Sequence, residues 1–435
     1  MARVVVVGGG FGGLASAARL AKLGHAVTLV ESEPALGGAL RPVEQDGFAW
    51  DGAATATILP AVVRDLFRKS GRPLERELTE VELDVVREHR FADGSSVRLP
   101  GGSRAAQLAA FDQLSDRRGR PLGQAWVDHV AAYRPAWEAL RLHVFEASTA
   151  EPPKPVRALL TSRETLQRRL RAALPDERLR LVAAHPFRAA GHDPRDVPAW
   201  AGLTAYLEQR FGCWTYQGGM AALGDALARR LVTRKVTALT GTTATDLVVR
   251  NGRVAAVATS AGEIDADAVV CAVDPRRLPA LSRHAAASMP AIPPSVVHLG
   301  LTGDLPDLPH ETVLHGDPTL VVRTGGRAPD GHQAWTVHVR GKLYEDVLVA
   351  LARHRIDLRE RVVSRVDLSP RELVQGWHGS PLGVVWQGRR SVRDRLGPLT
   401  PVPGVYAAGA HAVSGDGLPF VGLSAALVAQ AIGPA

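Results

Sequence analysis

The sequence is poor in cysteine and aromatic residues, and it has no long uninterrupted apolar run. Only Cys213 and Cys271 occur among 435 residues, so we expect no disulfide framework and a reducing compartment, the cytoplasm. No cluster of cysteine and histidine has metal-ligand spacing, and we predict no metal site. The longest apolar stretch, residues 418–432, is too short and too glycine-interrupted to span a bilayer. No signal peptide is expected, because Met1 is followed almost at once by an apolar strand.

The charge balance is basic, with a formal net charge of +8 that comes almost entirely from arginine. A basic surface suits anionic lipid head groups or nucleic acid. No nucleic-acid-binding motif is present, so we expect no such partner. Peripheral contact with the inner face of the membrane is left open. The candidate for this membrane contact is an arginine-rich helix near residues 162–174. We expect a capping box at residues 161–164 to start this helix. A helix with an ordinary solvated face is the alternative.

The chain opens with the pattern of a dinucleotide-binding unit. Val4–Val7 predicts a strand buried on both faces. A helix is expected over residues 14–23, and a second strand over residues 26–30 ends at Glu31. Between the first strand and the helix stands G-x-G-x-x-G, formed by Gly8, Gly10 and Gly13. The first glycine turns the chain, the second lets a diphosphate approach the backbone, and the third lets the helix pack closely on the strand. The start of the helix attracts phosphate, and the Glu31 carboxylate can accept hydrogen bonds from the ribose hydroxyls.

Two further segments of small residues fit the rest of a large cofactor. Residues 47–55 are dominated by small side chains, as where a chain lies against a flat ring system. Near the C-terminus a glycine-rich loop at residues 411–419 precedes a predicted helix over residues 420–432. The start of such a helix favours negative charge on a reduced ring. One fingerprint with glycine-rich sites at both ends of the chain fits FAD better than NAD.

Four segments of the chain resemble those of a known family, the phytoene desaturase-like flavoproteins of the FAD-dependent amine oxidase superfamily. The opening of many flavoproteins is similar to the first segment, whereas the last two segments are more specific. The segments are VVVVGGGFGGLASAARLAKLGHAVTLVESEPALGG, GFAWDGAATATILP, FGCWTYQGGMAALGDAL and GVYAAGAHAVSGDGLPFVGLSAALVAQAI.

The resemblance implies an α/β fold in which a discontinuous Rossmann-like FAD-binding domain of the glutathione reductase type carries an inserted mixed α+β substrate domain. We expect the FAD-binding domain over residues 1–65, 216–290 and 376–435. The substrate-binding domain is expected over residues 66–215 and 291–375. The length of the chain also favours more than one unit.

The resemblance also implies a set of FAD-binding residues. It places the diphosphate on the fingerprint glycines, the ribose on Glu31 and the adenine on the backbone of Val236. The family commonly has an arginine where Ala39 stands; Arg41 follows two residues later, on the same face if this stretch is a strand. The expected FAD-binding residues are Gly8, Gly10, Phe11, Gly12, Gly13, Glu31, Ser32, Gly38, Ala39, Leu40, Arg41, Ala53, Ala54, Thr55, Val236, Gly409, Ala410, Asp416, Gly417, Leu418 and Pro419.

The resemblance implies an FAD-dependent enzyme that desaturates or redox-isomerises a lipophilic, isoprenoid or polyene-like substrate by hydride transfer to the flavin. A quinone or oxygen is the expected electron acceptor. His411 is the candidate catalytic base, since imidazole exchanges protons near neutral pH; a loop histidine that bonds the backbone is the alternative. Two other functions stay open: a flavin-dependent amine oxidase, and a non-catalytic flavin-binding partner protein.

Overall fold

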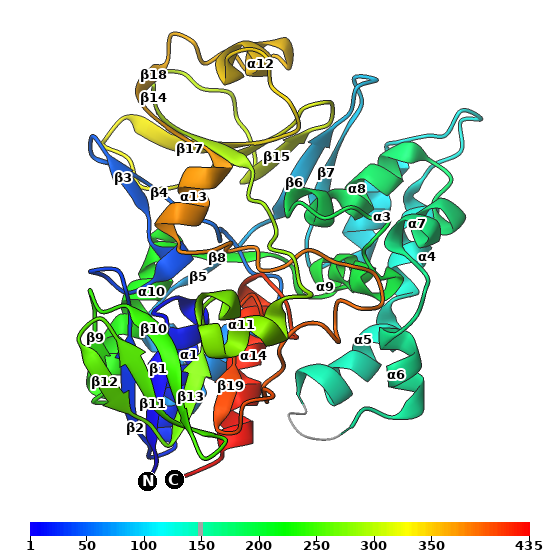
Figure 1. Cartoon of the computed structure of the whole chain (residues 1–435). Coiled ribbons are helices and arrows are strands. Elements are labelled where there is room, and N and C mark those ends of the chain that lie inside the picture. Colours follow the sequence, from blue (N-terminus) through cyan, green and yellow to red (C-terminus); the bar gives the residue numbers. More distant parts are fainter. Residues whose placement is uncertain (147–150) are drawn as a thin grey trace.

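A five-stranded parallel sheet forms the core of the lower part of the molecule (Figure 1). The computed structural model describes residues 1–146 and 151–435. The strands of this sheet come from distant parts of the chain, and their order is β19 (Val405–Ala407), β13 (Ala268–Cys271), β1 (Arg3–Val7), β2 (Ala26–Val30) and β9 (Thr237–Leu239).

The valine run of β1 is buried on both faces because successive side chains of a strand point to opposite sides. Val4 and Val6 lie in the core on the helical face of the sheet, and Val5 and Val7 lie in the core on its other face. The helical face is covered by α1 (Phe11–Lys22), α10 (Gly219–Thr233) and α14 (Leu418–Ile432), and α2 (Pro60–Ser70) packs on α1 and α14. The other face packs on α11 (Pro279–Ala285) and an antiparallel sheet of β10 (Ala244–Arg250), β11 (Arg253–Thr259) and β12 (Gly262–Asp265).

A seven-stranded sheet forms the upper part of Figure 1. It is antiparallel except where β15 pairs with β6. Its order is β18 (Val362–Leu368), β14 (Ser295–Thr302), β17 (His332–Arg340), β16 (Thr319–Thr324), β15 (Glu311–Leu314), β6 (Val85–Arg90) and β7 (Ser96–Pro100). Beside it lie α12 (Val347–Arg353), α13 (Pro370–Gly376) and the small hairpin of β3 (Val43–Gln45) and β4 (Phe48–Trp50). A second small sheet pairs β5 (Glu80–Glu82) with β8 (Trp214–Tyr216).

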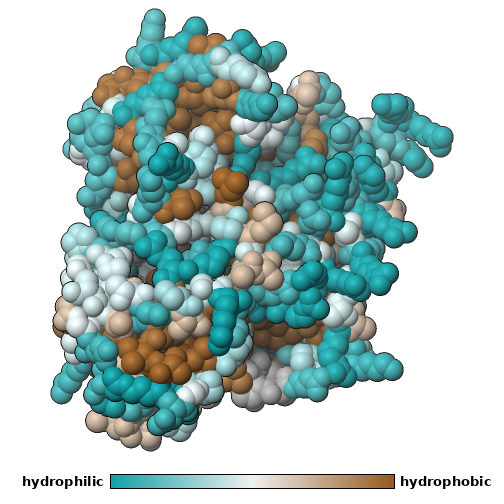
Figure 2. All heavy atoms as spheres, in the orientation of Figure 1, coloured by the Kyte–Doolittle hydropathy of each residue, from teal (hydrophilic) through white to brown (hydrophobic). Residues whose placement is uncertain are grey.

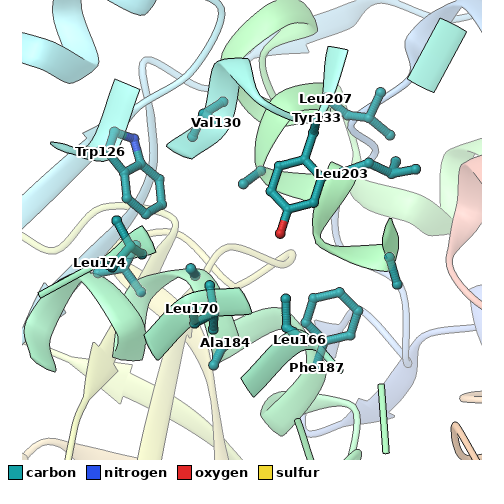
Figure 3. Close-up of a cluster of buried hydrophobic side chains, with 14 of the residues drawn as sticks. Trp126, Val130, Tyr133, Leu166, Leu170, Leu174, Ala184, Phe187, Leu203 and Leu207 are labelled. Atoms are coloured by element: carbon teal, nitrogen blue, oxygen red, sulfur yellow. The ribbon is translucent and has the colours of Figure 1, made fainter. Parts of the chain in front are cut away.

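A layer of helices completes the molecule on the right of Figure 1. Its core is shown in Figure 3, where Tyr133 and Trp126 face leucines from neighbouring helices. Trp126 also stacks on Phe111, with ring centroids 4.4 Å apart. The helices are α3 (Arg104–Asp112), α4 (Gly123–Ala131), α5 (Arg134–Leu140), α6 (Lys154–Leu160), α7 (Leu166–Ala173), α8 (Glu177–Ala189) and α9 (Leu203–Phe211).

This arrangement confirms the predicted α/β fold with a Rossmann-like parallel sheet. Hydrophilic side chains cover most of the face in Figure 2, and hydrophobic atoms gather over the upper sheet and the lower unit. Across residues 1–146 and 151–435, no helix combines the length and the apolar character that crossing a bilayer requires.

Two local expectations were wrong. The arginine-rich helix α7 begins after Thr165, whose hydroxyl accepts a hydrogen bond from the Arg168 amide at 3.3 Å, so residues 161–164 form no capping box. Glu164 instead binds the Arg169 guanidinium at 2.6 Å. The segment around Ala39 is not a strand but a 3-10 turn over Gly38–Leu40.

Candidate active site

A cavity of about 460 Å³, here called cavity A, opens at the carboxyl ends of β1 and β2. This edge is where open α/β sheets bind their ligands. Many residues predicted to bind FAD line it: Gly8, Gly10, Phe11, Gly12, Glu31, Ser32, Gly38, Ala39, Arg41, Gly409 and Ala410.

The fingerprint glycines of cavity A have different surroundings. A Cβ on Gly13 would stand 1.8 Å from the Gly8 carbonyl oxygen, so Gly13 allows the start of α1 to pack on the preceding turn. A Cβ on Gly12 would stand 2.9 Å from the Gly409 Cα of the closing segment. Gly10 has only the Gly38 Cα near it, at 4.0 Å, and faces the open space of cavity A. A Cβ on Gly10 would partly fill this space. The open space fits a diphosphate that approaches the backbone here.

Glu31 is fixed at the wall of cavity A by three hydrogen bonds to its carboxylate. The Gly9 amide donates at 2.5 Å, the Glu33 amide at 2.8 Å and the Ser32 hydroxyl at 3.1 Å. The carboxylate stands at the end of β2, where a ribose acceptor is expected. Arg41 also lines this cavity, with Nη1 3.5 Å from a Glu33 carboxylate oxygen.

The loop after α13 covers part of cavity A, which sequence reasoning missed. Trp377 and His378 line the cavity, and His378 Nε2 lies 2.7 Å from a Glu33 carboxylate oxygen. This contact joins residues 345 positions apart, so no local pattern signals it.

Several predicted residues lie outside cavity A. Gly13 has the packing position described above, and the buried Leu40 side chain packs near Gly224. Val236 precedes β9, donates its amide to the Leu231 carbonyl at 3.0 Å and lines neither this cavity nor those described below. Ala54 also lines none of these cavities, whereas Thr55 lines a small separate pocket near Asp51. Their roles toward FAD stay predictions.

Cavity B, of about 280 Å³, adjoins cavity A and lies against the seven-stranded sheet. The two cavities share Val43, Leu373, Trp377 and Pro381. The predicted flavin-side residues on its wall are Ala53, Asp416, Gly417, Leu418 and Pro419.

The sheet side of cavity B carries a buried ionic cluster. Glu311 accepts hydrogen bonds from Arg87 Nε at 3.0 Å and from Arg323 Nε at 2.8 Å. Arg87 also binds both carboxylate oxygens of Glu208, at 2.8 and 3.1 Å. His185 Nε2 lies 3.5 Å from Glu311. Although burial acts to raise it, these cations and His185 hold the pKa of the Glu311 carboxyl well below its usual range.

Sequence reasoning missed this cluster because its members come from β6, α8, α9, β15 and β16. One signal was present. His298 interrupts the mostly apolar β14, and His338 stands between Val337 and Val339 of β17; both histidines also line cavity B. Burial lowers the pKa of His298 to about 4, so its imidazole is neutral at pH 7.

Cavity C, of about 130 Å³, adjoins cavity B on the side of the helical layer. The two share Pro186, Ala190, Asp416 and Phe420. Most of its wall is apolar, and the apolar side chains include Leu140, Val144, Phe145, Leu160, Phe187, Leu203, Trp386 and Val392.

His411, the candidate base, lines cavity A and not cavity B. Its Nε2 lies 3.5 Å from an Asp274 carboxylate oxygen. Burial lowers the pKa of His411 to about 4, although Asp274 acts to raise it. The imidazole is therefore uncharged at neutral pH and is a weaker base than a free histidine.

Asp51 directly follows β4 and is hydrogen-bonded to the start of α10, and this contact can be tested by its effect on stability at different pH values. It accepts a hydrogen bond from the Met220 amide at 2.9 Å, and burial raises its pKa to about 6. Because the folded protein holds this proton more tightly than the unfolded chain, the Asp51 contribution to stability is lost as pH rises from about 4 through 6.

We expect Asp51→Asn to be more stable than the parent above pH 6, by up to about 3 kcal/mol, and to lose this advantage near pH 4. The side-chain amide oxygen of this variant would still accept the Met220 bond. Urea unfolding of both proteins at pH 4, 5, 6 and 8 measures the difference, from which groups common to both cancel. A difference that does not change with pH would contradict the assignment.

Comparison with known proteins agrees with this geometry. The family described as flavin containing amine oxidoreductase matches residues 11–432. The chain is 30% identical to a hydroxyneurosporene desaturase of Cereibacter sphaeroides, over 99% of this chain and 97% of that protein. It is 31% identical to a phytoene dehydrogenase of Streptomyces griseus, over 72% of this chain and 63% of that protein.

Among solved structures, cyclohexylamine oxidase from Brevibacterium oxydans has the same fold, with a TM-score of 0.67, 15% identity and coverage of 99% of both chains. The match to the family over almost the whole chain also identifies the cofactor as FAD. The chain therefore belongs to the flavin containing amine oxidoreductase family, among its phytoene desaturase-like FAD-dependent oxidoreductases.

Proposed function

We propose that this enzyme desaturates a lipophilic, polyene-like isoprenoid. The observation that carries the proposal is the apolar cavity C, which continues from the cavity that the predicted flavin-side residues line. An apolar chain lying through cavity C into cavity B would be held by many weak contacts and shielded from water. The desaturases named among the relatives act, by their names, on substrates of this kind.

The residues of cavities A and B fit FAD. The open backbone at Gly10 and the start of α1 suit the diphosphate, and Glu31 suits the ribose. Ala53 and residues 416–419 would lie against the flavin ring. FAD, when bound, supplies an acceptor for the hydride of a substrate C–H bond. The start of α14 at Leu418 would favour the negative charge that accumulates there.

Desaturation removes two hydrogens, one as a hydride and one as a proton from the neighbouring carbon. We keep His411 as the proposed proton acceptor because the closing segment that carries it also borders cavity B at residues 416–420, although burial makes its imidazole a weaker base than a free histidine. Turnover also needs a second electron acceptor, for which we propose a quinone or oxygen.

The test compares two classes of reductant under anaerobic conditions. Purified yellow holoprotein is mixed with phytoene or hydroxyneurosporene in detergent, and separately with putrescine or cyclohexylamine. We expect the polyenes to bleach the flavin and to yield products two hydrogens lighter by mass spectrometry. Bleaching by the amines with no response to either polyene would replace the proposal with an amine oxidase.

A further inference from the structure

We propose that residues 376–382, here called the strap, close over FAD in cavity A and are held in place by the contact between His378 and Glu33. FAD then enters and leaves only when this contact opens, so the strap controls exchange of the cofactor. The inference rests on the proposed placement of FAD in cavity A, and it does not depend on which substrate is oxidised.

The strap forms part of the wall of cavity A. Residues 376–381 line the cavity together with the fingerprint turn and the loop that follows β2. Figure 1 shows α13, which leads into the strap, at the lower edge of the upper unit, above the parallel sheet. His378 Nε2 lies 2.7 Å from a carboxylate oxygen of Glu33, which belongs to the loop after β2. This contact therefore joins two parts of the cavity wall that come from different units of the fold.

The strap has fixed ends and contains two glycines. The helix before it, α13, begins with a capping box. Gly383, directly after the strap, packs on the closing segment, where an added Cβ would stand 2.1 Å from the Ala410 carbonyl oxygen. Between these points, a Cβ on Gly376 would meet no described atom within 4 Å, and Gly379 has φ +148°, which other residues rarely adopt. Glycines between two fixed ends allow the strap to move while its anchors stay in place.

The turn at the end of α13 positions His378 for its contact. The Gly379 amide donates a hydrogen bond to the Val374 carbonyl at 2.9 Å, and His378 has φ +52°, as in a Schellman turn. Glycine is the commonest residue at this position, because other residues adopt the left-handed conformation at an energetic cost. A strained residue whose side chain joins two walls of a cavity is a candidate for a role in that cavity.

The contact between His378 and Glu33 is suited to repeated opening. The hydrogen bond with His378 lowers the pKa of the Glu33 carboxyl, so Glu33 is ionised at neutral pH. Arg41 Nη1 lies 3.5 Å from the same carboxylate, and Arg277 Nη1 donates to the His378 carbonyl at 3.0 Å. The two side chains are 37% and 36% exposed, and ion pairs this exposed are weak. The strap can therefore open while both units stay folded.

Trp377 extends the strap over the junction of cavities A and B. It lines both cavities, as does Pro381. An FAD molecule that runs from the fingerprint turn into cavity B would pass this junction. Opening of the strap would thus uncover the cofactor at Trp377 as well as near Glu33.

The test measures exchange of FAD in the holoprotein, so that it does not depend on turnover. Holoprotein is mixed with an excess of isotope-labelled FAD, and the labelled fraction that becomes bound is followed by mass spectrometry after rapid desalting. We expect His378→Asn to exchange FAD at least about threefold faster, the effect of losing one partly exposed ion pair. Asparagine also adopts the left-handed conformation, and its shorter side chain does not reach Glu33. Hydrogen–deuterium exchange should become faster within residues 376–382 and stay unchanged in the parallel sheet.

Glu33→Ala should have a similar effect on FAD exchange, and the double variant should be no faster than the faster single variant, because both changes break one contact. The matched control is Arg355→Asn. Arg355 has the same place in the same kind of turn at the end of α12, with φ +62° and a hydrogen bond from the Ile356 amide to the Leu351 carbonyl at 3.1 Å. Its side chain is exposed and is not among the described residues that line cavity A, so this variant should exchange FAD at the parental rate.

A parental exchange rate in His378→Asn would overturn the inference. So would effects that multiply in the double variant, since they would indicate two separate contacts with FAD, or faster deuterium exchange throughout the protein. An error in the placement of FAD would be detected separately, as a Gly10→Ala protein that keeps its affinity for FAD. Failure of any polyene to bleach the flavin would instead contradict the proposed function and leave this test unaffected.

Discussion

Gly10→Ala is expected to give a folded protein that binds FAD at least about 100-fold more weakly. Gly10 has φ −72° and ψ 179°, which alanine adopts without strain, and a Cβ there would meet no atom closer than 4.0 Å. The added methyl group would stand in cavity A, where the diphosphate must approach the backbone. FAD affinity is measured by flavin fluorescence during reconstitution of the apoprotein, and folding by circular dichroism.

Two other glycines make this experiment specific. Gly13→Ala should prevent folding rather than weaken binding, because its Cβ would overlap the Gly8 carbonyl oxygen at 1.8 Å. Gly316→Ala, with no atom closer than 3.4 Å and no place in cavity A, should keep both the fold and FAD. A Gly10→Ala protein that retains FAD at parental affinity would show that the diphosphate does not lie at this turn.

Arg87→Met is expected to destabilise the protein by about 3–5 kcal/mol. Arg87 lies between Glu208 and Glu311, all three side chains being 11% exposed or less, so its loss leaves two buried carboxylates without their shared cation. Methionine retains much of the side-chain volume, which limits the effect to charge and hydrogen bonding. Urea unfolding monitored by circular dichroism gives the change in free energy.

The matched control is Arg3→Met, since Arg3 also joins two carboxylates, those of Asp265 and Asp267, but at an exposed site. Exposed ion pairs contribute about 1 kcal/mol or less. Similar losses for the two variants would mean that burial of the Arg87 cluster has no energetic consequence. That result would contradict our description of cavity B as a site with a fixed ionic wall.

The parts of the fold and site that were predictable depend on short-range patterns. The valines of β1, the glycines that follow and Glu31 occur within one βαβ unit, where spacing along the chain fixes spacing in the structure. Gly10 and Arg41, both predicted to bind FAD, line cavity A, although the reason given for Arg41 assumed a strand where a 3-10 turn occurs.

The rest depends on contacts between distant residues. Arg87 and Glu311 meet only because β6 pairs with β15 across 224 positions. The wall of cavity C likewise joins His192 and Trp200 to the closing segment at Ser414. The misplaced cap shows a local limit as well. Thr161 and Thr165 both precede helix-forming residues. Thr165 is the residue that caps α7, and it also forms a β-bridge with the distant Pro198, which no local pattern reveals.

We propose that one FAD lies from cavity A into cavity B and that an apolar substrate reaches it through cavity C. The most direct measurement is a structure of the protein with FAD and a polyene bound. We predict the diphosphate at Gly10 and the start of α1, the flavin ring beside Leu418, and the polyene between Phe420 and Trp200. A flavin ring outside cavity B, or a polyene bound away from cavity C, would contradict the account.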